Sequence, residues 1–265
     1  MNATTVFLLA CAAHSAGIRQ QSPPPSITAA GLISKMFARY AGSKSVFGTI
    51  KMVQTAMNKS LEVDTTLAFE RPSLFYLLQH QADDKFPDEA IISDGIQVAY
   101  SKTPTAFSSV PRIIESVHPK GEPELTTTDF YKFIAVGQPL GKKTLPLNVA
   151  VGAKNDLMYT KYQLLTFTLS GKETVDGRDA YRIDGDWADE PTHPKEGTFS
   201  MWITPDGDLV QFANKMSFAV PAAYLKQQRL PLSAFPNGIV VDTVWSVSLT
   251  VDQPVNHNLF QLAKP

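Results

Sequence analysis

The residue types that most often carry chemistry are present in this chain, but their spacing does not form a site. Its five histidines are His14, His80, His118, His193 and His257, and no two share an H-x-x-x-H or H-x-H spacing. The sequence contains no G-x-S-x-G nucleophile elbow, no P-loop and no G-x-G-x-x-G motif. An enzyme would need scattered polar residues to converge in space. We therefore predict a non-enzymatic protein with no catalytic residue, no metal site and no cofactor.

Two Asp-Gly-Asp triplets resemble calcium loops only faintly. They are Asp184-Gly185-Asp186 and Asp206-Gly207-Asp208, and the 12-residue ligand spacing of a calcium loop is missing around both. Asp and Gly are also typical turn residues, so both triplets are predicted to be turns. The chain has one cysteine, which excludes an internal disulfide framework and a cysteine-based zinc site.

Length and composition favour a sizeable globular core. The 265 residues are 43% hydrophobic, and 24 basic residues nearly balance 25 acidic ones. No basic run exists that would neutralise a phosphate backbone, so nucleic-acid binding is disfavoured. The 19 prolines lie mostly between apolar runs, which is typical of strands and loops.

Alternating apolar and polar residues predict an antiparallel sheet. In residues 61–69, Leu61, Val63, Leu67 and Phe69 alternate with polar or small residues, as expected for a strand with one buried face. Residues 45–56, 75–79, 90–93, 96–100, 164–171, 180–184, 198–204, 209–218 and 239–251 complete a set of about ten strands. Asp-Gly pairs at 94–95, 176–177 and 206–207 predict tight turns, the last two of type I′. The fold class is therefore mainly β (α+β), with a strongly curved sheet.

One helix is predicted near the N-terminus. Ser26 is the expected N-cap, and apolar residues recur at helical spacing up to Gly42. Prolines divide residues 103–162 into short pieces, of which 129–136 and 145–151 fit short helices. This segment is either a helical insertion over one face or mouth of the sheet, or an irregular loop without function.

The first 25 residues fit an export signal followed by a linker. Residues 6–13 are apolar, small residues follow, and 20–26 are polar and proline-rich. Residues 8–11 also resemble a lipobox, in which Cys11 would be acylated and tether the protein. The alternative is a frayed tail, since residues 1–5 carry no Lys or Arg. We expect residues 26–265 to form a single domain in the periplasm or cell envelope, with peripheral membrane association as a further expectation.

Several motifs together resemble the LolA-type outer-membrane lipoprotein-sorting family. They are the Arg71-Pro72 segment at 69–75, the Ser93-Asp94-Gly95 hairpin at 91–100, the Asp176-Gly177 hairpin at 175–183, the Trp202 strand and turn at 201–207, and the ending from Asn256 to Pro265. They occur in the family's order across residues 26–265. Two departures, no second basic residue after Arg71 and a long 103–162 segment, argue against a direct hand-over of lipoproteins.

This resemblance implies an incomplete barrel with covering helices and an apolar cavity for acyl chains. The residues that would bind lipid are Met36, Phe37, Tyr40, Val63, Leu67, Phe69, Phe75, Leu77, Trp245, Val247 and Leu249, although they would equally pack a core. Arg71 would steady a movable lid or bind a lipid headgroup, or form a structural salt bridge. The implied function is binding of lipid acyl chains or lipoproteins for transport or sorting. The alternative is a sensor or regulatory module on the same fold that acts through an envelope protein partner.

Overall fold

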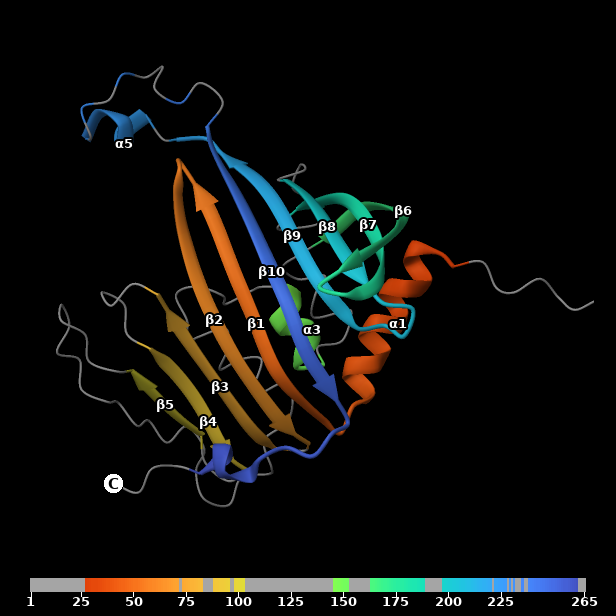
Figure 1. The fold of residues 1–265 in the computed structure, drawn as a ribbon. Helices are drawn as coiled ribbons and strands as arrows, with labels where there is room; N and C mark the ends of the chain where they lie inside the picture. Colours follow the sequence, from red (N-terminus) through yellow and green to blue (C-terminus); the bar gives the residue numbers. More distant parts are fainter. Residues whose placement is uncertain are drawn as a thin grey trace, which may run out of the picture.

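The part of the chain that the structure describes forms one antiparallel sheet of ten strands with a few helices (Figure 1). This computed structural model describes residues 27–71, 73–82, 88–95, 98–102, 145–152, 163–188, 197–220, 222–227, 229, 231, 235 and 238–261. The N-terminal elements are α1 (Ala29–Gly42), β1 (Ser45–Ala56), β2 (Lys59–Glu70), β3 (Leu74–Gln81), β4 (Glu89–Asp94) and β5 (Val98–Lys102). They are followed by α3 (Leu145–Ala150), β6 (Gln163–Val175), β7 (Arg178–Ala188), β8 (Gly197–Ile203), β9 (Leu209–Phe218), α5 (Ala222–Gln227), β10 (Ile239–Val251) and the 3₁₀ helix η2 (His257–Phe260).

The strand order joins two meanders at the middle of the sheet. The order is β5-β4-β3-β2-β1-β10-β9-β8-β7-β6, so the first and last strands of the chain pair with each other. The edge strands β5 and β6 are consecutive in the chain, and the sheet does not close into a barrel. The predicted fold class, a curved antiparallel sheet forming an incomplete barrel, is confirmed.

The two predicted covering elements lie on the same face of the sheet. Helix α3 packs against β1, β9, β10 and α1, and it lies behind β1 and β10 in Figure 1. Helix α1 packs against α3, β6 and β8. The helix predicted within 145–151 is therefore present and lies over the sheet. Residues 129–136, like most of the 103–162 segment, lie outside the described residues.

Local chemistry explains where α1 begins. Thr28, rather than the predicted Ser26, is the N-cap, because its Oγ1 accepts a hydrogen bond from the Gly31 N–H at 3.1 Å. The helix ends at Gly42 as predicted, and the backbone N–H of Ser43 donates to the Tyr40 carbonyl.

The turns follow the Asp-Gly signals only in part. Asp176 and Gly177 have φ of 49° and 73°, as in the predicted type I′ turn. At the second site only Gly207 has positive φ (93°), and its N–H donates to the Thr204 carbonyl. The type I′ prediction is wrong there, because Pro205 fixes a negative φ at the first central position and so selects a type I turn. The other Asp-Gly-Asp triplet, Asp184-Gly185-Asp186, lies within β7, so the prediction of a turn there is wrong.

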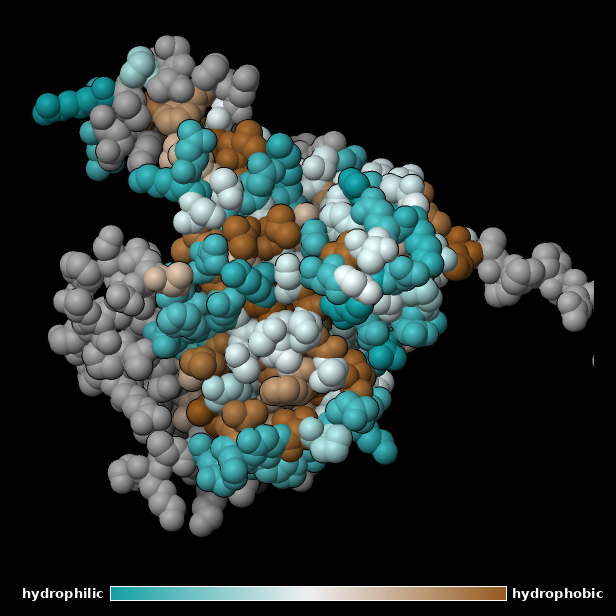
Figure 2. Space-filling view, in the orientation of Figure 1, coloured by the Kyte–Doolittle hydropathy of each residue, from teal (hydrophilic) through white to brown (hydrophobic). Residues whose placement is uncertain are grey.

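The outer face of the sheet is mixed in character (Figure 2). Phe47, Val240 and Val244 are exposed there, among polar neighbours on β1 and β10. Near β3 and β4, η2 covers a small apolar cluster in which Ala68 packs with Phe260. The chain ending that sequence motifs singled out is therefore packed against the sheet as far as Phe260.

Candidate functional site

The inner face of the sheet carries one continuous apolar cluster. All residues predicted to bind lipid are buried within it: Met36, Phe37, Tyr40, Val63, Leu67, Phe69, Phe75, Leu77, Trp245, Val247 and Leu249. The first three lie on α1, and the others on β2, β3 and β10. The sequence thus located a common surface correctly, and its lipid-binding role remains a prediction.

Strand register places these side chains side by side. Leu67 on β2 lies opposite Leu77 on β3, and Phe69 lies opposite Phe75. Because successive residues of a strand point to opposite faces, these pairs share the inner face. On the other side of β1, Trp245 and Val247 of β10 continue the same face.

The C-terminal meander contributes as much to this interior as the N-terminal one. Phe199 and Phe212 have ring centroids 6.2 Å apart, and Phe212 and Trp245 are 5.4 Å apart. Our prediction omitted the other members of this half, of α3 and of the residue that follows α3: Leu145, Leu147, Val149, Ala150, Val151, Ile183, Trp187, Met201, Ile203 and Leu209. The alternation of Phe199, Met201 and Ile203 is the signal that would have found part of this set.

Polar side chains also lie within the apolar interior. Two pairs are hydrogen-bonded: Gln79 Nε2 donates to Thr65 Oγ1 at 3.2 Å, and Gln54 Nε2 donates to Thr243 Oγ1 at 3.3 Å. In the described part of the chain, the buried atoms Gln81 Oε1, Asn148 Oδ1, Asn214 Oδ1 and Trp245 Nε1 have no hydrogen-bond partner.

Arg71 fastens the end of α1 to the corner between β2 and β3. Its Nε donates to the Ser43 carbonyl at 2.7 Å and its Nη2 to the Tyr40 carbonyl at 3.2 Å, at the negative end of the helix dipole. The guanidinium carbon lies 5.1 Å from the centre of the Phe69 ring. Burial lowers the pKa of Arg71. These contacts are structural, and a lid or headgroup role for Arg71 remains a prediction.

Tyr40 predicts an alkaline limit to stability. Burial, followed by the charge of Asp208, raises the pKa of its hydroxyl from 10.0 to about 12. A group whose pKa is raised on folding contributes stability that is complete below its unfolded pKa and is lost as pH rises through its folded pKa. We therefore expect the free energy of unfolding to fall between pH 10 and 12. Urea titrations of the wild type and of Tyr40→Phe should show a steeper decline in the wild type, by about 3 kcal/mol across this range; parallel pH profiles would contradict this expectation.

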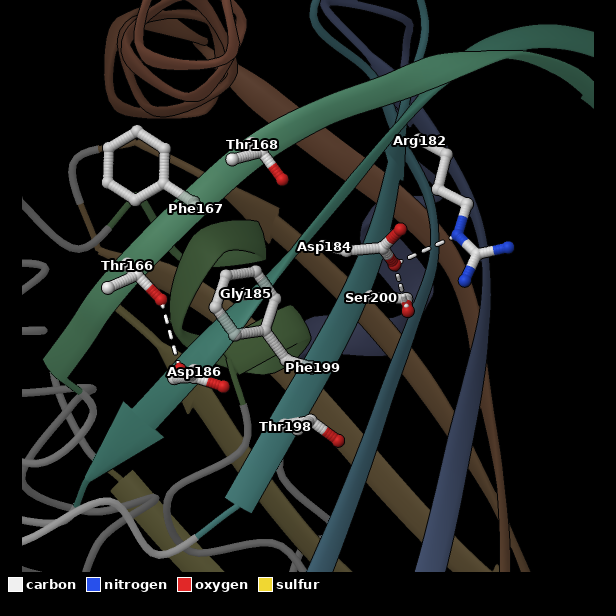
Figure 3. A pocket seen from close by; sticks show the side chains of 10 residues that line it. All are labelled: Thr166, Phe167, Thr168, Arg182, Asp184, Gly185, Asp186, Thr198, Phe199 and Ser200. Atoms are coloured by element: carbon white, nitrogen blue, oxygen red, sulfur yellow. Dashed lines mark hydrogen bonds and ion pairs between the residues drawn. The ribbon is translucent and has the colours of Figure 1, made fainter.

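A polar pocket of about 400 Å³ opens on β6, β7 and β8 (Figure 3). Asp184 accepts hydrogen bonds from Ser170, Ser200 and Arg182, and Thr166 donates to Asp186. Burial pushes the pKa of Asp184 upward, but these three donors together lower it below its ordinary value. The carboxylate of Asp184 is thus engaged within the protein.

Gly185 lies between Asp184 and Asp186 in the sequence, and glycine is needed there because the backbone of β6 approaches it closely. A Cβ at Gly185 would lie 1.9 Å from the Thr166 carbonyl oxygen and 2.8 Å from the Phe199 ring. The glycine that suggested a turn is therefore required by strand packing.

The histidines that the structure describes do not assemble a site. His80 pairs with Asp88 at 2.7 Å and His257 with Glu70 at 3.0 Å, and both histidines are exposed. Within the described ranges, no group of three or more His, Cys, Asp or Glu side chains is arranged to hold a metal ion. Cys11, His14, His118 and His193 lie outside those ranges. In the same ranges, we find no helix with the length and hydrophobicity needed to cross a membrane.

No family model matches the sequence, and no curated protein matches it. The solved structures that match include proteins of the family that the sequence motifs resemble. The lipoprotein LppX of Mycobacterium tuberculosis is 13% identical over 85% of this chain and 96% of its own, with a TM-score of 0.39. A LolA superfamily protein of Nitrosomonas europaea is 12% identical over 89% of this chain and 99% of its own, with a TM-score of 0.31. A chain of the Pseudomonas aeruginosa MucA/MucB complex is 11% identical over 88% of this chain and 60% of its own, with a TM-score of 0.38.

Proposed function

We propose that this protein binds acyl chains of lipids or lipoproteins on the inner face of its sheet, and carries or sorts them in the cell envelope without catalysing a reaction. The observation that supports this most directly is the continuous apolar cluster on one face of a sheet that does not close. An open curved sheet cannot bury such a face against itself, so other elements must cover it.

The cover is suited to being displaced. Helix α3 is six residues long and packs on β1, β9 and β10 through buried side chains such as Leu147 and Val149. A helix and a sheet share no backbone ladder, so separating them breaks apolar contacts while the strands stay paired. An acyl chain entering between them would replace those contacts, and each methylene buried is worth about 0.8 kcal/mol.

Native mass spectrometry of the purified protein tests this proposal directly. We expect a mass excess that corresponds to lipid, and we expect the delipidated protein to bind a fluorescent fatty acid. Delipidated, folded protein that binds no such probe would overturn the proposal. If a co-purified protein takes the place of lipid, the result would favour the regulatory module instead.

Two tryptophans on opposite faces of the sheet provide a matched comparison. Trp245 lies within the inner cluster, whereas Trp202 packs with Ala180 and Val210 in a separate cluster on the outer face. We expect Trp245→Gln to weaken binding of the fluorescent fatty acid at least tenfold, because it places a polar group among apolar contacts. Trp202→Gln should leave probe affinity within about twofold, measured by titration on variants shown to be folded by circular dichroism.

A further inference from the structure

Three buried polar groups of the interior lie on three elements that pack against one another. Asn148 on α3, Asn214 on β9 and Trp245 on β10 are 2%, 5% and 4% exposed. Their Oδ1, Oδ1 and Nε1 atoms have no hydrogen-bond partner among the described residues. Buried polar groups in folded proteins are almost always paired, because an unpaired one loses its hydration without compensation. Unpaired atoms on elements that pack together therefore point to a ligand that pairs with them.

Strand register fixes how two of these groups are placed. Asn214 lies opposite Thr243, and Trp245 lies opposite Phe212, two positions along the same pair of strands. Residues in this relation are diagonal neighbours on one face, so the amide of Asn214 and the indole of Trp245 border the same space. Helix α3, which carries Asn148, packs on both strands.

The surroundings of these groups are apolar and aromatic. Asn214 lies opposite Phe199 on β8, and the rings of Phe199, Phe212 and Trp245 follow one another across the face. Thr243 is already engaged, since its hydroxyl accepts a hydrogen bond from Gln54. On the other half of the same inner face, Gln79 and Thr65 satisfy each other. Gln81 Oε1 on β3 is also unpaired among the described residues, but Asn214 and Trp245 are the pair that lie diagonally opposite each other on neighbouring strands.

The chemistry of the unpaired atoms restricts the group that fits them. The two amide oxygens accept hydrogen bonds, and the indole N–H donates one. A plain methylene chain offers neither, and an ester carbonyl or carboxylate only accepts. A hydroxyl both donates and accepts through a single oxygen, and it is small enough to sit on an otherwise apolar chain.

We propose that the interior selects acyl chains that carry a hydroxyl group within the chain, and that this hydroxyl donates to the amide oxygen of Asn214 and accepts from the indole N–H of Trp245. This inference rests on the proposed function and names its ligand class: hydroxylated acyl chains. The aromatic rings contact the methylenes on either side, and the polar groups fix the position of the hydroxyl along the chain.

The test compares 12-hydroxystearate with stearate on delipidated, full-length protein by isothermal titration calorimetry below their micelle concentrations. We expect the wild type to bind 12-hydroxystearate about tenfold more tightly, as one or two net hydrogen bonds allow. Asn214→Leu, a change of similar size, should reduce this ratio to about one while retaining affinity for stearate. Met201→Leu, on a neighbouring apolar position, should leave the ratio unchanged. Trp245→Phe provides a second variant that removes only the donor, in case Asn214→Leu does not fold.

The outcomes separate the two proposals. Equal wild-type affinities for both fatty acids, or a ratio that Asn214→Leu and Trp245→Phe leave intact, would overturn the selectivity and leave the proposed function standing. Failure of the folded wild type to bind either fatty acid would overturn both.

Discussion

Gly48→Ala is expected to lower the free energy of unfolding by about 3–5 kcal/mol. Gly48 has φ of 150°, which side-chain-bearing residues rarely adopt. A Cβ at this position would lie 2.0 Å from the Ser248 carbonyl oxygen and 2.9 Å from the Leu249 Cα. Both atoms belong to the backbone of β10, so a rotamer change cannot relieve the clash. Urea denaturation of the purified variant measures the effect.

Gly171 provides the matched control. It has φ of 151°, but a Cβ there would meet no atom within 4 Å. Gly171→Ala therefore reports the backbone strain alone, and we expect it to cost about 1–2 kcal/mol. Equal losses in the two variants would show that the close approach of β1 and β10 is unimportant.

Arg71→Met is expected to cost about 2–3 kcal/mol of stability. The substitution keeps much of the apolar stem against Phe69 and removes the hydrogen bonds to the carbonyls of Tyr40 and Ser43. Arg71→Lys should restore less than half of the loss, because one ammonium does not reproduce a fork that donates from two nitrogens. Both values come from urea denaturation.

Arg39→Met is the comparison for Arg71. Arg39 lies on α1, the helix that Arg71 contacts, and its ion pair with Asp208 is partly exposed, so we expect a loss of about 1 kcal/mol or less. If Arg39→Met lowers the free energy of unfolding as much as Arg71→Met, the hydrogen bonds of the Arg71 guanidinium do not contribute more to stability than an exposed ion pair of α1.

Regular alternation made the sheet predictable from the sequence. Residues 239–251 were identified with their bounds, since apolar positions such as Val247 and Leu249 recur at every second residue. The same alternation predicted that Leu67 and Phe75 lie on one face, and helical spacing predicted that Met36 packs against that face; all three are in the inner cluster. These patterns are local, and local patterns fix which face a side chain occupies.

The features that were missed depend on contacts between distant segments. Gly185 was predicted to lie in a turn, because glycine between two Asp residues is typical of turns. The contact that makes glycine necessary is with the Thr166 carbonyl of another strand, and it leaves no local signal in the sequence. Asn148 and Asn214 carry no signal in the sequence that both are buried in the interior. A side chain that packs the core and a side chain that holds a ligand are both buried, so burial does not distinguish the two roles. Sequence therefore located the inner face but did not separate these two roles.

The pairing of β1 with β10 also has a consequence for the order in which the strands pair during folding. Thr250 donates to the Phe47 carbonyl across a separation of 203 residues, whereas β1 to β5 pair with their neighbours in sequence. Local hairpins close small loops and form quickly, but a contact of such high sequence separation carries a large entropic cost. We expect each meander to form early and the central seam to form last, as the rate-limiting step. Until then, two half-sheets would each expose an unpaired edge and half of an apolar face, which makes this interval the most prone to aggregation.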